Sequence, residues 1–231
     1  MSKKVSIVVP VYNGEKFIVN CLQQLLDQDY ENTEIIVVND GSTDNSLDLI
    51  NRNFENIKVF SKQNGGTGSA LNLGFSKAKG EFFTWASCDD VKYKNYISTL
   101  VRALEESDCQ FCFSKFDQFV DPNFDSRINK NYSRMPHSGI MHNFLNTTYR
   151  YCATGICFMF TKKMKQMCGP YDEIPGEDYI MGAKMGLLTD VYFVNETLGA
   201  HRLHPESLTV KTPSCTNEAG KKVKEILRNY A

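Results

Sequence analysis

The first half of the chain alternates between the patterns of buried strands and of helices four times within residues 4–104. Short runs rich in β-branched residues, such as 4–9 and 34–40, are typical of strands covered on both faces of a sheet. Between these runs, apolar residues recur with the spacing of amphipathic helices. Such alternation requires right-handed crossovers and a mostly parallel sheet. The sequence therefore predicts an α/β fold, a doubly wound sheet of the nucleotide-binding type with helices on both faces.

The second half lacks this strict alternation and predicts a mixed α+β region. Its expected strands are residues 109–120, 156–160, 191–194 and 198–203, with one short helix ending at Cys168 and another beginning near Glu177. No low-complexity linker or internal repeat separates the halves. We therefore expect a single domain over residues 1–231, with halves at about 1–107 and 108–210 and a tail helix at 211–231.

The tail helix is basic and amphipathic, with an apolar side formed by Val223, Ile226, Leu227 and Tyr230. We expect it to dock on its own domain, and contact with an acidic membrane surface is the alternative. The apolar run at the N-terminus, Val5 to Val11, is too short for a signal peptide core or a membrane span. A cytoplasmic protein is predicted, with possible peripheral contact at the inner face of the cell membrane.

Charge and cysteine content exclude several classes of protein. A formal net charge of −1 offers no basic surface of the kind that nucleic acids require. The eight cysteines, without a secretory signal, are interpreted as reduced thiols. Cys109 and Cys112 have the spacing of half a zinc site, but a strand would point them to opposite faces. Structural cysteines are therefore expected.

Three segments place polar or small residues just after predicted strands: "PVYNGE", "VNDGSTD" and "WASCDD". Ligands of open α/β sheets bind beyond the carboxyl ends of the strands. Asp40 could accept hydrogen bonds from a base or ribose there, or could serve only as a turn or capping acid. The glycines between Gly65 and Gly74 do not match a dinucleotide-binding loop, because Leu71 stands where the third glycine belongs. No Walker-type loop occurs, so a dehydrogenase or ATPase has little support.

Five segments together resemble glycosyltransferase family 2, whose members have the GT-A fold. They occur in the order "VSIVVPVYNGEKFI", "EIIVVNDGSTDNS", "NGGTGSALNLGFSKAKGEFFTWASCDD", "CGPYDE" with "PGED", and "HRLHPESLT", and they span roughly residues 4–210. The resemblance implies a nucleotide-sugar donor held by the first half and an acceptor held by the second. A role in bacterial surface-polysaccharide assembly is the expectation that follows.

The resemblance also implies roles for individual residues. The donor nucleotide is expected to contact Pro10, Tyr12, Glu15, Asp40, Asn72, Ser87, Cys88 and Arg202. The family's Asp-x-Asp-Asp motif falls on residues 87–90, which implies that Asp89 ligates Mn²⁺ or Mg²⁺ together with His204. Ser87 departs from the motif by replacing its first aspartate, and Cys88 is too soft a donor to suit either ion. Asp90 is expected to cap the following helix or to support the site from behind Asp89.

The acidic pair Glu177–Asp178 is expected to act on the acceptor, with Asp178 as the catalytic base and Glu177 orienting the acceptor. A helix N-terminus would hold such a carboxylate ionised, as a base requires. The implied reaction is an inverting, metal-dependent transfer of a hexosyl or N-acetylhexosaminyl group. Its donor is expected to be a UDP-sugar, and its acceptor the hydroxyl of a glycan or lipid-linked molecule.

Two other functions compete with this prediction. A non-catalytic GT-A-fold module that only binds nucleotide-sugars would account for Ser87. A sugar nucleotidyltransferase would need a G-x-G-[ST]-[RK] loop early in the chain, and "PVYNGEKF" does not supply one. No feature of the sequence predicts an oligomeric state.

Overall fold

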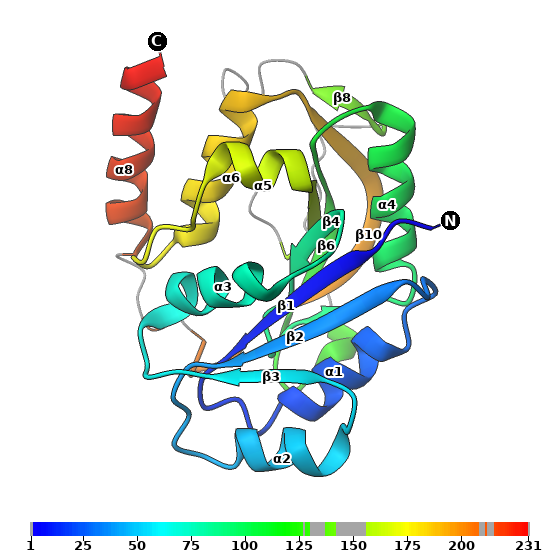
Figure 1. Cartoon of the computed structure of the whole chain (residues 1–231), viewed down its shortest axis with the longest axis vertical. Coiled ribbons are helices and arrows are strands. Elements are labelled where there is room, and N and C mark those ends of the chain that lie inside the picture. The colour runs from blue at the N-terminus through cyan, green and yellow to red at the C-terminus, as the bar shows by residue number, and fades with distance from the viewer. Residues whose placement is uncertain are drawn as a thin grey trace.

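A single mixed sheet forms the centre of the computed structural model, which describes residues 2–126, 128–129, 137–141, 156–207, 211 and 215–230 (Figure 1). The strand order is β3-β2-β1-β4-β9-β6-β10-β5, with β7 beside β6 and β8 beside β10. The strands are β1 (Val5–Val11), β2 (Thr33–Asn39), β3 (Lys58–Ser61), β4 (Phe82–Trp85), β5 (Val91–Lys92), β6 (Phe111–Val120), β7 (Ile128–Asn129), β8 (Gly139–Met141), β9 (Phe158–Thr161) and β10 (Val191–Leu203). The helices are α1 (Ile18–Leu26), α2 (Ser46–Asn53), α3 (Gly66–Lys77), α4 (Tyr96–Ser107), α5 (Lys162–Cys168), α6 (Glu177–Leu188) and α8 (Cys215–Tyr230), and a 3₁₀ turn covers Phe124–Ser126.

The two halves of the sheet differ in strand direction, which confirms the predicted α/β fold. Neighbouring strands among β3, β2, β1 and β4 are parallel, as their helical crossovers require. In the second half β9 runs antiparallel to both β4 and β6, β10 is parallel to β6, and β5 is antiparallel to β10. Strand β9 thus joins the parallel half to the mixed half in one continuous sheet.

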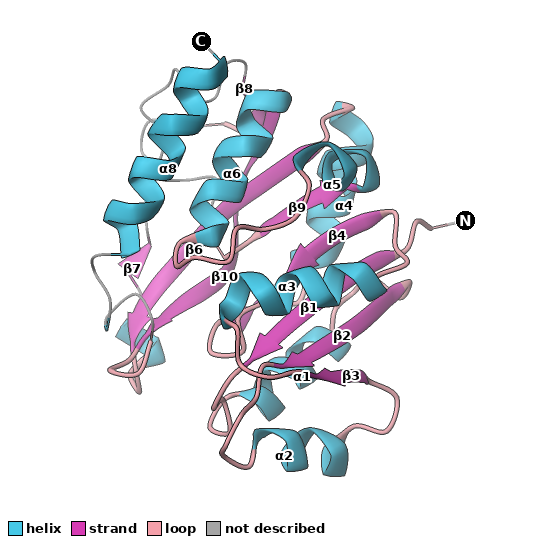
Figure 2. Cartoon of the chain, turned by 60° about the vertical axis from the view of Figure 1, so that its left-hand side comes forward, coloured by secondary structure: helices cyan, strands magenta, loops and turns pink. Residues whose placement is uncertain are grey.

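Helices cover both faces of the sheet, as Figure 2 shows for α3 on one side and α1 and α2 on the other. Successive strand residues point to opposite faces, so a continuous apolar run feeds two cores. In β1, Val5, Ile7 and Val9 pack into the core shared with α1, α2 and α4. Val8 points the other way, into the aromatic-rich core beneath α3, α5 and α6.

The structure corrects one element of the second half. The two strands expected at residues 191–194 and 198–203 are one strand, β10, of 13 residues. Its pairing with β6 shifts register between Val194 and Thr197 and again between Thr197 and Ala200. These irregularities explain why the sequence resembles two short strands, since a bulge interrupts the alternation of side chains.

The C-terminal helix α8 docks on its own domain, as expected. Its residues Ala219 and Val223 are buried against Ile180 and Ala183 of α6, with Ile226 packed alongside. The side chains of Leu227 and Tyr230, which the sequence also assigned to this apolar side, lie outside the described part of the chain. None of the described helices has both the length and the apolar character that a membrane span requires.

Candidate functional site

The "WASCDD" segment and the end of β10 are joined directly by hydrogen bonds. Asp90 Oδ1 accepts a hydrogen bond from the backbone N–H of Arg202 at 3.1 Å, and Arg202 Nε donates to the carbonyl oxygen of Asp89 at 2.8 Å. Upstream, the N–H of Ala86 donates to the carbonyl oxygen of Val8, which ties the segment to β1. The two motifs therefore meet beside the carboxyl end of β1, where open α/β sheets bind ligands.

Asp89 and His204 are in contact at this junction. His204 Nε2 lies 3.0 Å from Asp89 Oδ2, while Asp89 Oδ1 accepts a hydrogen bond from the hydroxyl of Ser87. The imidazole packs against the ring of Phe17, with ring centroids 4.9 Å apart. The structure thus brings together two residues that are 115 positions apart in the sequence and that were both predicted to hold a metal ion.

The chemistry of this pair fits a hard divalent cation. Mg²⁺ and Mn²⁺ accept carboxylate and imidazole ligands, and Mg²⁺ is commonly held by one or two protein groups plus substrate phosphates. No group of three or more His, Cys, Asp and Glu side chains with ligand geometry occurs among the described residues, so a cation here would have Asp89 and His204 as its predicted protein ligands. Cys88 does not suit such an ion, because thiolates prefer softer metals and desolvation raises the pKa of this partly buried thiol, which lies beside Gly14.

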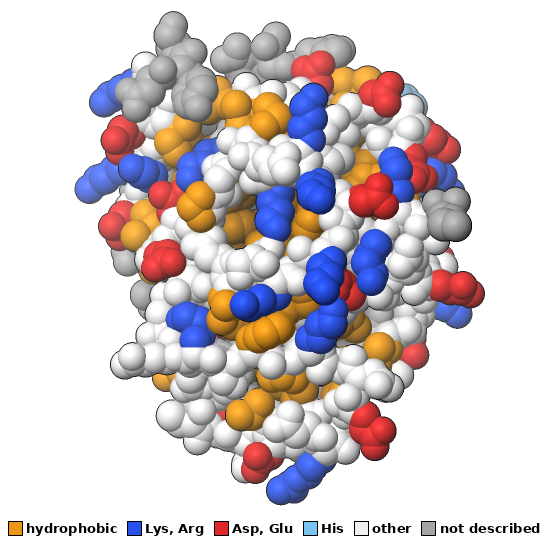
Figure 3. All heavy atoms as spheres, viewed as in Figure 1, with side chains coloured by type: hydrophobic (Ala, Val, Ile, Leu, Met, Phe, Trp, Pro, Cys, Tyr) orange, Lys and Arg blue, Asp and Glu red, His pale blue; other side chains and the backbone are white. Residues whose placement is uncertain are grey.

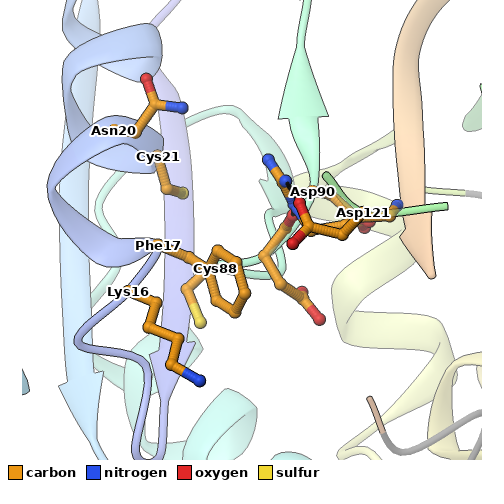
Figure 4. Close-up of a pocket in the computed structure, with 9 residues that line it drawn as sticks. Lys16, Phe17, Asn20, Cys21, Cys88, Asp90 and Asp121 are labelled. Carbon is orange, nitrogen blue, oxygen red and sulfur yellow. Dashed lines mark hydrogen bonds and ion pairs between the residues drawn. The ribbon is translucent and has the colours of Figure 1, made fainter. Parts of the chain in front are cut away.

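A cavity of about 290 Å³ opens next to Asp89 (Figure 4). The Arg202 guanidinium group pairs with Asp121 and lies over the rings of Phe17 and Phe119, at 5.1 and 4.8 Å from their centroids. The predicted diphosphate contact, Arg202, therefore lines the cavity with its charge already paired to a carboxylate. The full lining comprises Lys16, Phe17, Asn20, Cys21, Cys88, Asp89, Asp90, Asp121 and Arg202.

Asp90 is bonded to the backbone of β10 and does not cap a helix. Helix α4 begins only at Tyr96, and Asn95 occupies its N-cap position. Burial, and then the charge of Asp89, raise the pKa of Asp90 to about 7. Its hydrogen bond from the Arg202 N–H acts in the opposite direction and fixes the carboxyl group against β10. Of the two predicted roles, the capping role is therefore wrong.

Asp40 is anchored to the glycine-rich loop at the end of β2. Its carboxylate pairs with Lys62 Nζ at 2.8 Å and accepts hydrogen bonds from the backbone N–H groups of Gly65 and Gly66. The side chain is 4% exposed. In this conformation both carboxylate oxygens therefore hold the loop, and a nucleotide contact would compete with these bonds.

The other predicted donor contacts of the "PVYNGE" segment lie in the last residues of β1 or just after it. Glu15 accepts hydrogen bonds from the backbone N–H and the side-chain amide of Asn45, which joins the "PVYNGE" segment to the start of α2. Tyr12 is exposed, and Pro10 is partly buried within β1. Of Pro10, Tyr12 and Glu15, Tyr12 has the most exposed side chain.

Asn72, another predicted donor contact, hydrogen-bonds the segment before α6. Its amide oxygen accepts from the backbone N–H of Tyr171 at 2.8 Å, and its amide nitrogen donates to the Tyr171 carbonyl oxygen at 3.0 Å. Asn72 also borders a second cavity, of about 240 Å³, between α3, α5 and α6. Figure 3 shows hydrophobic side chains in hollows on this face, with Lys and Arg side chains around them. The amide of Asn72 therefore fixes the segment that leads to α6.

The Glu177–Asp178 pair stands at the first turn of α6, as predicted. Glu177 is buried and Asp178 is partly buried. Burial raises the pKa of Asp178 to about 6, although the N–H of Tyr179 donates to its carboxylate at 2.7 Å. Burial and the charge of Asp178 raise the pKa of Glu177 to about 7. Burial, which raises both pKa values, thus opposes the helix N-terminus, which favours the ionised carboxylate.

His201 lies on β10, three residues before His204. Its imidazole lies close enough to Asp89, Asp178 and His204 for their charges to act on its pKa, which burial lowers overall. Its Nδ1 is 3.4 Å from the side-chain nitrogen of Gln118 on β6. His204 follows the last residue of β10, so strand alternation does not relate the two histidines. His201 therefore lies within electrostatic reach of both the Asp89–His204 pair and the acidic pair.

Comparison with known proteins identifies relatives over most of the chain. A family model described as "Glycosyl transferase family 2" matches residues 6–166. An uncharacterized glycosyltransferase of Rickettsia typhi is 34% identical over 221 residues, covering 90% of this chain and 66% of that protein. Glycosyltransferase GlyG of Streptococcus pneumoniae is 39% identical over 130 residues, covering 54% and 43% of the two chains. The chain thus spans just under two thirds of the Rickettsia typhi relative.

Solved structures share the fold at low sequence identity. TarS 1–349 of S. aureus in complex with UDP-GlcNAc superposes with a TM-score of 0.78 at 20% identity, covering 95% of this chain and 65% of TarS. A mannosyltransferase of Pyrobaculum calidifontis in complex with GDP-Man and Mn²⁺ gives a TM-score of 0.72 at 15% identity, covering 99% and 65%. At these identities the likeness establishes the architecture of the chain and no more.

Proposed function

Because the chain belongs to glycosyl transferase family 2, we propose that it transfers a sugar from a nucleoside-diphosphate sugar to a hydroxyl group of an acceptor. The observation that carries the proposal is the contact between Asp89 and His204 beside a 290 Å³ cavity at the carboxyl end of β1. Positive side chains, Lys16 and Arg202, line that cavity and suit the negative charge of a diphosphate.

The proposed donor is a UDP-sugar, and the transferred group is a hexosyl or N-acetylhexosaminyl residue. TarS, which shares the architecture, was solved with UDP-GlcNAc, whereas the mannosyltransferase was solved with GDP-Man. Both complexes support a nucleotide-sugar donor, and the UDP complex supports the choice of base. The proposed acceptor is a glycan or lipid-linked hydroxyl, used in polysaccharide assembly at the inner face of the cell membrane.

In the proposed reaction Asp178 is the base. Its carboxylate takes the proton of the acceptor hydroxyl while the hydroxyl oxygen attacks the sugar carbon that bears the diphosphate. The bond between that carbon and the diphosphate oxygen breaks, the nucleoside diphosphate leaves, and the configuration of the carbon is inverted. A pKa raised to about 6 suits this task, since a base works best when its pKa is close to the working pH. Glu177, next to it, orients the acceptor.

Asp89 and His204 would hold Mn²⁺ or Mg²⁺, which when bound neutralises charge on the leaving diphosphate. Ser87 supports this role despite the missing aspartate, because its hydroxyl donates to Asp89 and orients the carboxylate. Asp90 positions Arg202 through the backbone, and Arg202 in turn holds the carbonyl of Asp89. The loop and the strand end are therefore organised around Asp89.

Binding calorimetry with UDP, in Mn²⁺ and then in EDTA, tests the donor site, with GDP, CDP and dTDP as comparisons. We expect one of these nucleotides to bind, and to bind only when the metal is present. We also expect the sugar donor of that nucleotide to release the nucleoside diphosphate when an acceptor is supplied. Metal-dependent binding without turnover would favour the non-catalytic module, for which Ser87 is the motivating observation. No binding of any of the four nucleotides would refute the proposed function.

A further inference from the structure

Two buried polar atoms near the acidic pair have no hydrogen-bond partner among the described residues. They are Nε1 of Trp85, at the end of β4, and the hydroxyl of Tyr171, in the segment before α6. Tyr171 is only 5% exposed. Buried polar groups are nearly always paired in native proteins, and each exception calls for an explanation.

The position of Tyr171 is fixed from two sides. Its ring stacks on Phe75 with centroids 5.7 Å apart and an interplanar angle of 8°. The side chain of Asn72 hydrogen-bonds both the N–H and the carbonyl oxygen of Tyr171. The phenol is therefore held in one place although its hydroxyl makes none of these contacts.

Tyr171 lies within electrostatic reach of the acidic end of α6. Tyr171 packs in the same core as Trp85 and Met181, and Met181 lies one helical turn after Glu177 on the same face of α6. The charges of Asp178 and Glu177 add to burial in raising the pKa of Tyr171, and Trp85 acts in the opposite direction. The phenol thus stays protonated next to two carboxyl groups.

The chemistry of the two side chains sets the direction of donation. The indole N–H of tryptophan can only donate, whereas a phenol both accepts and donates. If the Trp85 N–H approaches the oxygen of Tyr171, the single phenol proton is left for an acceptor elsewhere. An ionised carboxylate of the acidic pair can only accept hydrogen bonds, whereas a protonated one also donates through its own O–H.

We propose that Tyr171 is a positioning residue for the acidic pair: backed by the Trp85 N–H, its hydroxyl donates a hydrogen bond to the Glu177–Asp178 pair when the pair is ionised. The effect of this hydrogen bond on catalysis rests on the proposed function. Donation to the ionised form favours that form and thereby offsets part of the desolvation. His201 also acts on Asp178, and Cys168 acts on Tyr171, so both remain unchanged in the test.

The test compares the whole chain with its Tyr171→Phe variant, which removes the hydroxyl and keeps the ring that stacks on Phe75. Carbon-13 NMR titration of labelled Asp and Glu carboxyl groups is the first readout, with Asp178→Asn used to assign the signals. The acid limb of the pH profile of kcat/KM is the second. Tyr30→Phe is the matched control, because the Tyr30 hydroxyl donates to the carbonyl oxygen of Lys3 at the other end of β1.

We expect Tyr171→Phe to move the titration of the pair, and the acid limb, to higher pH by about one unit, the effect of losing one hydrogen bond to a charged group. Trp85→Phe should cause a smaller shift in the same direction, and Tyr30→Phe should cause none. An unchanged carboxyl titration in Tyr171→Phe would overturn the inference. If Tyr171→Phe does not fold, an unchanged titration of the Glu177–Asp178 pair in Trp85→Phe would overturn the inference instead. A wild-type chain without transferase activity would refute the proposed function, while the NMR titration would still decide the role of Tyr171.

Discussion

Replacing Asp178 by asparagine should make the protein more stable at neutral pH while removing its activity. Asp178 has an ordinary pKa of 3.8 in the unfolded chain and about 6 in the folded one. As pH rises from about 4 to 6, the unfolded chain therefore loses this proton before the folded chain does. The free energy of unfolding therefore decreases over that interval, and this decrease is complete above pH 6.

The size of the effect follows from the shift of about 2 pKa units, at about 1.4 kcal/mol per unit. The asparagine side chain would carry no charge, and its oxygen can still accept the hydrogen bond from the Tyr179 N–H. The variant should therefore be more stable than the wild type by up to about 3 kcal/mol at pH 8, and by almost nothing at pH 4. Loss of the base should at the same time lower kcat by about 10² to 10⁴.

Urea denaturation at pH 4 and pH 8 measures the difference in stability, and release of nucleoside diphosphate measures kcat. The surface substitution Asp27→Asn is the control, because Asp27 is exposed and its carboxylate accepts a hydrogen bond from the equally exposed side chain of Gln23. A difference in stability that is the same at both pH values would refute the argument that burial raises the pKa of Asp178. Full activity with the expected gain in stability would instead remove Asp178 from the proposed reaction.

Three further substitutions test other contacts. Asp89→Asn should abolish metal-dependent turnover with the fold intact, as measured by activity with and without Mn²⁺ and by circular dichroism; unchanged activity would contradict the assignment. Gly74→Ala should lower the free energy of unfolding by about 1–3 kcal/mol, because a Cβ there would lie 2.3 Å from Cγ1 of Val8, and an unchanged urea midpoint would show that α3 can shift away from β1. Lys62→Met should lower the free energy of unfolding in urea by about 2 kcal/mol or more, since it leaves the buried carboxylate of Asp40 without its ion pair. An unchanged free energy of unfolding would mean that the backbone N–H groups of Gly65 and Gly66 are enough to stabilise that carboxylate.

The parallel half of the sheet could be predicted from sequence because each of its strands is a continuous apolar run followed by a helical stripe. Strand β10 could not, since two register shifts break its alternation. The same limit explains His201, whose place relative to His204 depends on where β10 ends. Local periodicity describes regular elements, and it fails where a strand is irregular or stops.

The site was predictable only in part, for a different reason. Motifs of the sequence indicate Asp89 and His204, whereas no role for Phe17 follows from them. The structure places Phe17 just before α1, where its ring contacts His204 and Arg202. The raised pKa values of the acidic pair depend on burial by elements far apart in the sequence, which no local pattern reports.

The bonds between Asp90 and Arg202 have a consequence for the thermodynamics of ligand binding. They hold the backbone of the "WASCDD" segment against β10 before any ligand arrives, so the carboxylate of Asp89 and the imidazole of His204 already face each other. Ordering a loop or a side chain on association costs conformational entropy, and groups that folding has already ordered escape that cost. Association with a donor should therefore show a smaller entropic penalty in the wild type than in Asp90→Ala, even though Asp90 itself touches no ligand in the proposed reaction.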